Sequence, residues 1–354
     1  MPVKIAPYQL SFLVANFIFT GTLISLPQSL AELANQNSWM APLPGFIFMA
    51  VFISLIIGGT EQLAKFSKKF LAGKRSIIEK AFLIAFGVLF AFTFIRDVRG
   101  LVDFVATVLL PTTPIDVLSI LATLIIIYVA GSGLEVITRV TAIHFTLLAA
   151  IVIFLPFMLL NEINLANFQP VFTSTFMMGL SKSSFVLFSW IGEGVFILLL
   201  LGNVNNVKKA RRAALKGFAV GMGLLSILLA LMISVLGVDI VAASTYPAHQ
   251  MVQQINLTDF LDRLDLIIVT VWIPTFMSKI ALDLYMVNRC LTGGRDQDIN
   301  VIIIPLGLTL GLLSILMFHN NMEHFHFSFY TWAGLGLGIQ LLIGFLFLLR
   351  RKFS

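Results

Sequence analysis

The chain has 354 residues, of which 58% are hydrophobic and 11% are charged, and its mean hydropathy is +0.99. A soluble domain of this length must present part of its surface to water, so this composition excludes one and indicates a protein of the lipid bilayer. The net charge of +6 comes from short basic clusters between apolar runs, which argues against a nucleic-acid-binding surface. A single cysteine, Cys290, excludes an intramolecular disulfide and a cysteine-built metal site.

Ten apolar windows predict membrane-spanning helices, each of which needs roughly 20 mostly apolar residues. The first window follows only Met1–Pro7 and contains no small-residue cleavage site, so we expect it to be retained and not cleaved as a signal peptide. The ten windows are Gln9–Leu26, Leu43–Ile57, Ile77–Ile95, Ile115–Ala130, Ala142–Leu160, Ser184–Leu200, Leu215–Leu236, Leu266–Val287, Val301–Phe318 and Tyr330–Leu349.

The basic residues predict the orientation, because lysine and arginine gather at the cytoplasmic ends of membrane spans. With the N-terminus inside and ten alternating spans, 18 of the 23 lysine and arginine residues fall on the inner side. Lys182 and Arg263 fall outside, while Arg96, Arg99 and Lys279 fall within or beside spans. We therefore predict an even number of spans with both termini in the cytoplasm.

The first window contains a polar interruption, "FTGTLISLP", which ends in a proline. A break in a membrane helix frees backbone N–H and C=O groups, and these are tolerated only where they line a cavity. Freed groups at helix ends attract the charged ends of a ligand. We predict that Thr20, Gly21, Thr22, Leu23 and Ile24 form part of a ligand site. The alternative is close helix packing, which small residues also favour.

The third window ends in a polar stripe. Arg96, Arg99 and Asp103 are spaced so that they share one helix face, with Asp97 turned away. One interpretation is a solvated helix end with an Arg99–Asp103 pair, and the other is an outer vestibule or a contact with another subunit.

Polar residues elsewhere suggest structural roles. Glu135 and Arg139 are four residues apart and are expected to form a tie at an inner loop. His144 is expected to pack through a hydrogen bond, with proton relay as the alternative. The stretches Asn161–Ser183 and Asp239–Leu264 are predicted outside, as lids or as helices lying at the membrane interface.

The sixth window places a glutamate between two glycines, in "SWIGEGVFILLL". A carboxylate within a membrane helix costs roughly 2.5–3.5 kcal/mol on insertion scales, and each glycine costs about 1 kcal/mol of helix stability relative to alanine. We interpret Ser189, Gly192, Glu193 and Gly194 as a second broken segment of the ligand site. The glycines let the helix unwind, and Glu193 faces a cationic group of the ligand or a polar partner. Helix packing is again the alternative.

Lys279 lies well inside the eighth window, between Ser278 and Asp283. A lysine at that depth does not reach the membrane surface, so it needs a partner. Asp283 is one helical turn away, and Glu193 is another candidate. His324 and His326 are two residues apart in a polar turn, where a solvated loop is favoured over a metal, and we predict no metal site.

The two interrupted windows stand about 170 residues apart, near half the length of the chain, and interrupted segments at matching positions indicate an inverted-repeat transporter fold. We therefore predict an all-α polytopic membrane protein, with ten transmembrane helices in one domain over residues 1–354. Two inverted five-helix repeats cover residues of about 8–160 and 184–349, with helices 1 and 6 broken at mid-membrane.

Several short motifs resemble one family. The most specific are "LPTTP" (Leu110–Pro114), "GLEVITR" (Gly133–Arg139) and the run Asp262–Lys279, accompanied by "FTGTLISLP", "NLANFQPVF", "FSWIGEGVF" and "YPAHQ". Together they resemble the permease-like B subunit of spore nutrient-germinant receptors, a family similar to the amino acid–polyamine–organocation transporters. The resemblance extends over nearly the whole chain.

The resemblance implies ten helices in inverted repeats, a small nutrient ligand and partner A and C subunits in the inner membrane of a bacterial spore. Family members are associated with amino acids, sugars or nucleosides, and an amino acid is the ligand that we expect. In sodium-coupled transporters of the related fold, helices one and eight hold a cation. The ammonium of Lys279 is therefore a candidate to stand in for that ion, as the alternative to a structural pair with Asp283.

Two functions follow. The first is a nutrient sensor, which binds a small ligand and signals to partner subunits. The second is a proton-coupled permease, which transports an amino acid. A membrane enzyme is excluded because the spans contain no nucleophile–base pair and no metal-ligand constellation. We predict no cofactor.

Overall fold

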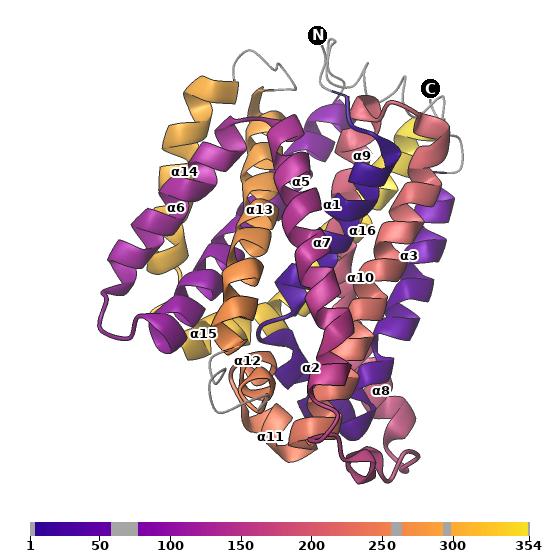
Figure 1. Ribbon diagram of the computed structural model, residues 1–354. Coiled ribbons are helices and arrows are strands. Elements are labelled where there is room, and N and C mark those ends of the chain that lie inside the picture. Colours follow the sequence, from indigo (N-terminus) through magenta and orange to yellow (C-terminus); the bar gives the residue numbers. More distant parts are fainter. Residues whose placement is uncertain (1–3, 58–76, 256–263, 293–298, 353–354) are drawn as a thin grey trace.

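The computed structural model describes residues 4–57, 77–255, 264–292 and 299–352. Within these ranges the regular elements are helices, accompanied by a single β-bridge between Ile5 and Val204. The basic cluster at 65–75, which contributes to the predicted orientation, lies outside the described residues. Figure 1 shows the long helices side by side, with α1 starting and α16 ending at the same end of the molecule.

The first half of the chain forms six helices, of which α1 and α2 make one bent span and the next four run alternately along the bundle (Figure 1). Short 3₁₀ or π segments follow three of them, η1 (Asn35–Met40), η2 (Val105–Leu109) and η3 (Leu165–Phe168). The helices are α1 (Pro7–Thr22), α2 (Leu26–Ala34), α3 (Pro42–Ile56), α5 (Ile77–Phe104), α6 (Ile115–Gly131) and α7 (Leu134–Met158).

The second half of the chain contains more short elements. Its short segments are η4 (Gly192–Phe196), α9 (Ile197–Leu200), η5 (Leu201–Asn203), α11 (Val238–Ala243), α12 (Pro247–Val252), α15 (Asn321–His326) and η6 (Phe327–Thr331). Its long helices are α8 (Phe176–Ile191), α10 (Val207–Leu236), α13 (Leu264–Thr292), α14 (Ile299–Leu316) and α16 (Trp332–Lys352).

The chain is an integral membrane protein by the length and apolarity of its helices. Among the described residues six helical segments are long and apolar enough to cross a membrane, and the bent pair α1–α2 makes a seventh candidate. Three shorter apolar helices, Pro42–Ile56, Ile115–Gly131 and Ile302–Leu316, fall on three more of the windows expected from the sequence. The number of ten spans stays a prediction.

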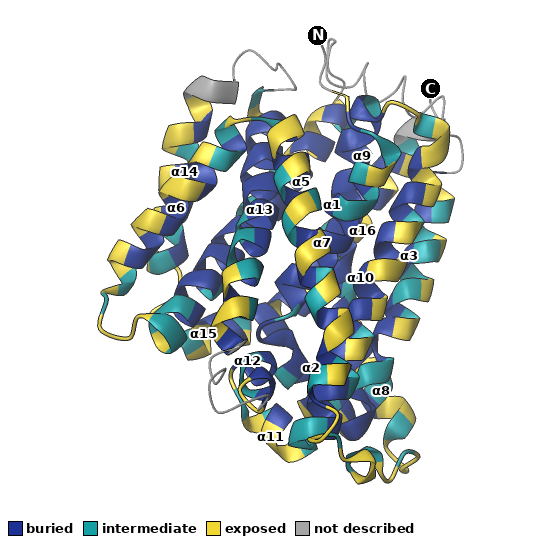
Figure 2. Cartoon of the chain, viewed as in Figure 1, coloured by how far each residue is buried: buried dark blue, intermediate teal, exposed yellow. Residues whose placement is uncertain are grey.

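Burial follows the arrangement expected in lipid. Figure 2 shows exposed residues on the outward faces of α3, α6, α7 and α14, while α1 and α13 are buried in the middle of the bundle. The outward faces are themselves apolar, since Ile47, Ile120, Ile143 and Leu312 are all more than half exposed. Apolar side chains on the outside are stable against lipid tails and not against water.

The break predicted in the first span is present. α1 ends at Thr22, α2 begins at Leu26, and the two helices are bent by 69°. Pro27 favours the break, because a proline has no N–H to bond to the carbonyl four residues earlier, here that of Leu23, and its ring clashes with that carbonyl. The break thus lies at residues 23–25, just after Gly21.

The sixth span differs from the prediction. α8 continues at Gly192 into the 3₁₀ segment η4 and then into α9, so that Phe176–Asn203 forms one continuous span. The two glycines instead permit close packing. A Cβ atom at Gly192 would overlap the Gln340 amide, and one at Gly194 would overlap the Phe218 ring. The predicted unwinding of this helix is therefore wrong, and a tighter helical turn takes its place.

Short helices cover one end of the bundle. α11 and α12 lie there within the stretch that the sequence predicted as a lid, and η3 lies in the other such stretch. The described parts of both stretches thus contain short helices.

Candidate functional site

Four ionisable side chains meet next to the break in the first span, beside Gly21. They are Arg96 and Asp97 of α5, Glu193 of η4 and Lys279 of α13, and we call this set the charge ring. Each of the four residues is at most 3% exposed. A charge costs several kcal/mol to remove from water unless it is paired, so the arrangement of these four groups decides whether the bundle is stable.

The charges alternate around the ring. Arg96 Nη2 lies 2.7 Å from Asp97 Oδ1, and Arg96 Nη1 lies 2.7 Å from Glu193 Oε1. The Lys279 ammonium contacts Asp97 Oδ2 and lies 3.1 Å from Glu193 Oε2. Each acid therefore touches both bases, and each base touches both acids. The four formal charges sum to zero, and the ring ties three helical segments together.

Aromatic rings enclose the cations. The Arg96 guanidinium lies 3.8 Å from the ring centre of Trp190 and 5.2 Å from that of Trp332. Lys279 Nζ lies 4.4 Å from the ring centre of Phe17 in α1. The aromatic faces attract these cations and exclude water. Trp332 also donates its indole N–H to Glu193 Oε1 over 3.2 Å, so α16 contributes to the ring as well.

A small cavity connects the charge ring to the break. It is lined by Gly21, Ile24, Ser25 and Trp190 together with Arg96 and Asp97, and its volume of about 20 Å³ admits about one water molecule. A Cβ atom placed on Gly21 would lie 3.6 Å from Lys279 Cε and 3.9 Å from the Trp190 ring. The broken segment and the ring therefore share one wall.

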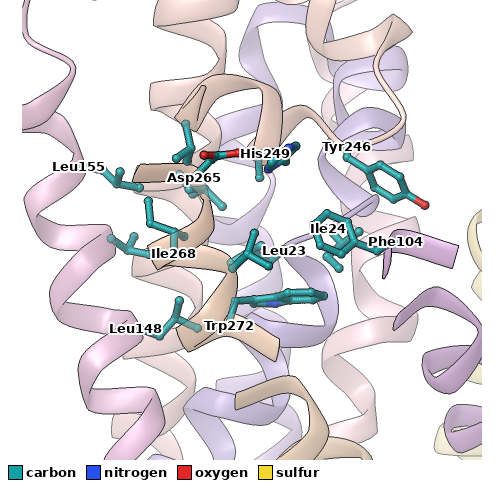
Figure 3. Close-up of a pocket in the computed structure, with 15 residues that line it drawn as sticks. Leu23, Ile24, Phe104, Leu148, Leu155, Tyr246, His249, Asp265, Ile268 and Trp272 are labelled. Atoms are coloured by element: carbon teal, nitrogen blue, oxygen red, sulfur yellow. Dashed lines mark ion pairs between the residues drawn. The ribbon is translucent and has the colours of Figure 1, made fainter. Parts of the chain in front are cut away.

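A second, larger cavity lies on the other side of Ile24. Figure 3 shows Leu23 and Ile24 of the break above Trp272, with Leu148, Leu155 and Ile268 beside them. Its walls are apolar except at one end, where His249 Nε2 lies 4.0 Å from Asp265 Oδ2. At about 40 Å³ it has room for a few waters.

Tyr246 lies at the edge of the second cavity, just before α12. Figure 3 shows its hydroxyl directed away from Leu23. Burial, together with the nearby Asp103 carboxylate, raises the pKa of the phenol, so Tyr246 stays neutral at physiological pH.

The hydroxyl groups predicted for the ligand site bond within their own helices. Thr20 Oγ1 donates to Asn16 O over 2.7 Å, Thr22 Oγ1 donates to Ile18 O over 2.9 Å, and Ser189 Oγ donates to Val186 O over 2.8 Å. Such bonds bend a helix and satisfy its carbonyls. Of the predicted site residues, Gly21, Leu23 and Ile24 line the two cavities, whereas the hydroxyls of Thr20, Thr22 and Ser189 are turned to the backbone of their own helices.

Ser278 belongs to a polar cluster that joins three helices. Its hydroxyl accepts from Asn16 Nδ2 over 3.2 Å and from Thr141 Oγ1 over 3.1 Å, and it donates to Thr275 O over 2.7 Å. α1 and α13 thus meet through neutral hydrogen bonds at Ser278 and through Phe17 and Gly21, which lie beside Lys279.

Lys279 has different main partners from the one expected by spacing. Asp283 Oδ2 lies 3.5 Å from the ammonium, farther than either acid of the ring. The predicted contact with Glu193 is present. Glu193 is 1% exposed and points into the bundle, as predicted, although the helix around it does not unwind.

Two predictions about the third span are wrong. Asp97 is not turned away but is part of the charge ring, because α5 packs against α13 on that side. Arg99 and Asp103 do form a pair, with 2.8 Å between Arg99 Nε and Asp103 Oδ1, but both are buried and not solvated. Arg99 also donates to the carbonyl of Phe318.

His324 is likewise not in a solvated loop. It is buried in α15, with Nδ1 3.2 Å from Asp103 Oδ2 and Nε2 3.0 Å from the carbonyl oxygen of Arg96. The described part of the chain holds no cluster of three or more metal-ligating side chains.

Two other predictions for polar residues are confirmed. Glu135 and Arg139 form the expected pair, 2.5 Å apart on an exposed surface. His144 bonds to the carbonyl of Val140 over 2.9 Å, in line with the packing role.

Sequence reasoning missed three contributors to this region. Asp97 follows Arg96 directly in an apolar helix, and that dipeptide was a usable signal. Trp332 and Gln340 come from the last helix, and no local pattern connects them to Glu193. Gln340 Nε2 donates to Ser189 O over 2.6 Å, filling the space that Gly192 leaves.

Comparison with known proteins identifies relatives along most of the chain. A family model described as spore germination protein matches residues 4–322. The putative spore germination protein YfkT of Bacillus subtilis (strain 168) is 31% identical over 292 residues, covering 80% of this chain and 78% of that protein. Spore germination protein KB of the same organism is 26% identical, covering 91% of this chain and 87% of that protein.

Solved structures with a similar fold are transporters. One is a Na⁺-coupled sialic acid symporter in a substrate-bound outward-open state, with a TM-score of 0.62 and 11% identity, over 97% of this chain and 79% of that one. Another is Mhp1, a nucleobase-cation-symport-1 family transporter in a closed conformation with bromovinylhydantoin bound, with a TM-score of 0.60 and 15% identity, over 99% of this chain and 80% of that one. At these identities the likeness concerns the fold.

Proposed function

Because the chain belongs to the spore germination protein family, with B-subunit-like relatives, we propose that it is the ligand-binding membrane subunit of a nutrient-germinant receptor. The nutrient binds at the break in the first span, and binding changes the contacts of the charge ring. The observation that carries this proposal is the shared wall between Gly21 and Lys279. A ligand group that enters the smaller cavity at the break lies against Arg96 and Asp97 of the ring.

The two cavities suggest the chemistry of the nutrient. The smaller one is lined by Ser25, Arg96 and Asp97 and suits a charged group, whereas the larger one is apolar around Leu23 and Trp272. Ile24 lies between them. A small molecule with one charged end and one apolar end fits this division, and an amino acid with an apolar side chain is the first candidate. Because both cavities are small, binding requires the side chains around Ile24 to move apart.

Assembly and location follow from the same proposal. As a B-type subunit the chain associates with A and C partner subunits in the inner membrane of the spore. It crosses that membrane ten times, with two inverted five-helix repeats and both termini in the cytoplasm. Support comes from the helices that occupy all ten apolar windows and from the common end of α1 and α16.

A glycine substitution tests the binding site. Amino acids, sugars and nucleosides are screened on purified protein for an increase in Tm, which a ligand of the folded state produces by mass action. Gly21→Leu should abolish the increase, because the larger side chain meets Lys279 and Trp190, while the protein still inserts. Gly334→Leu is the matched control, since no atom lies within 4 Å of its added Cβ. An unchanged response of Gly21→Leu would place the site elsewhere.

The second candidate function is a proton-coupled amino acid permease, and the transporter fold favours it. Uptake of the radiolabelled ligand into proteoliposomes distinguishes the two. A receptor subunit binds the ligand without accumulating it, whereas a permease concentrates it when a proton gradient is applied. Cotranscription of the gene with those of A and C subunits would support the receptor.

A further inference from the structure

One buried acid is left over once the charge ring is complete. Asp283 lies one turn after Lys279 in α13 and is 0% exposed. The ring already pairs two acids with two bases. Asp283 therefore raises the number of carboxyl groups at the ring to three, against two cations. If all five groups were ionised, the centre of the bundle would hold a net charge of −1.

The surroundings of Asp283 do not stabilise a carboxylate. Neither of its oxygens has a hydrogen-bond partner among the described residues. Its closest cation, Lys279 Nζ, is 3.5 Å from Oδ2 and is already held by the two acids of the ring. Arg96 and Asp97 of α5 and Glu193 of η4 are the other charges that act on it.

The other helices packed on α13 bring no further charge to Asp283. α14 has no ionisable side chain among its residues. On α1, α6, α7 and α12 the ionisable side chains are exposed or half-buried, and His249 is paired with Asp265 at the far end of α13. These side chains are Tyr8, Asp116, Tyr128, Glu135, Arg139, His144 and His249.

A buried carboxylate without hydrogen bonds is avoided in proteins, and the usual outcome is that the group takes up a proton. Within a membrane bundle such a residue marks a functional site by default. We propose that Asp283 is an exchangeable proton-binding site, a carboxylic acid while the charge ring is closed and a carboxylate when Lys279 leaves the ring to pair with it. The O–H bond of Asp283 then breaks, the proton passes to water, and Lys279 remains an ammonium.

The position of Lys279 links this proton to the break. The Lys279 side chain lies beside Gly21, where the proposed nutrient binds, so a ligand that draws Asp97 or Glu193 away from Lys279 releases the proton of Asp283. This link rests on the proposed function. The presence of the proton rests only on the charge balance and the contacts of Asp283, and the two are tested separately.

The test is infrared spectroscopy of the purified protein at neutral pH without any ligand. A protonated carboxyl group has a C=O stretch that shifts in D₂O and is absent from a carboxylate. The wild-type protein should show one such band that disappears in Asp283→Asn. Asp97→Asn and Glu193→Gln should also remove it, because either substitution leaves two acids for two bases and allows Asp283 to ionise.

Thermal stability separates a proton site from a structural ion pair. Asp283→Asn mimics the protonated acid and should keep the wild-type Tm, whereas Asp97→Asn and Glu193→Gln open the ring and should lower it. A wild-type spectrum without the band, or an Asp283→Asn variant as unstable as the ring variants, would overturn the proposal. So would a Tm that depends on sodium or potassium in wild type and not in Asp283→Asn, since a metal ion would then balance the charge.

Discussion

Lys279 is the member of the charge ring that connects it to the broken first span. Its ammonium contacts Asp97 of α5 and Glu193 of η4, and its stem lies beside Gly21 of α1. Lys279→Met leaves both acids with Arg96 as their only base. Removal of one partner from a buried ion pair costs about 3–5 kcal/mol. We therefore expect a lower apparent Tm in detergent and lower abundance in the membrane.

Two further variants show whether a change in Tm comes from the buried ion pairs. Lys182→Met removes an exposed lysine and should leave Tm unchanged. The double variant Lys279→Met/Asp97→Asn removes a base together with one acid, and it should recover part of the lost stability because the remaining charges balance better. If Lys279→Met melts like the wild type, the ring contacts contribute nothing to stability.

We expect the bend between α1 and α2 in the first span to depend on Pro27. Pro27 has no N–H to donate to the carbonyl of Leu23, and its ring clashes with that carbonyl, which favours a bend between α1 and α2. Pro27→Ala removes this obstacle, and we expect a population in which the span is straighter. Spin labels at Tyr8 and Glu32, in a Cys290→Ser background, report the change, because a straight helix would separate these positions by about 36 Å and the 69° bend holds them closer.

The parent with the same two labels is the control for that experiment. A distance distribution that does not lengthen in Pro27→Ala would show that packing of α2 against α8, and not the proline, maintains the bend.

Elements could be predicted from the sequence where their cause is local. Apolar windows located the helices, and Pro27 after a run of small polar residues located the first break. The sixth span shows the limit of this reasoning. A glycine suits both an unwound helix and a close approach, and the choice at Gly192 is made by Gln340 of α16. No pattern within the window reports that distant partner.

The same limit applies to the charge ring. Glu193 and Lys279 stood out because each is a charged residue in an apolar window. The prediction for Asp97 is wrong because it takes the polar face of α5 from the spacing of Arg96, Arg99 and Asp103. The rotation of a helix in a bundle is set by its neighbours, here α13, so burial on a given side follows from tertiary packing.

For the whole molecule, the distribution of basic residues predicts which end of the bundle faces the cytoplasm. Exposed positions at the two ends of the described helices allow this orientation to be tested. Ser132 and Asn206 are exposed at the end of the bundle where α1 begins, and Thr112 and Leu165 are exposed at the opposite end. With ten spans and a cytoplasmic N-terminus, cysteines introduced at 132 and 206 in Cys290→Ser protein should resist a membrane-impermeant maleimide added to intact cells. Cysteines at 112 and 165 should react. Permeabilised cells provide the control, because all four positions should react there. The reverse pattern would place the termini outside, and two reactive ends on one helix would show that the helix does not cross the membrane.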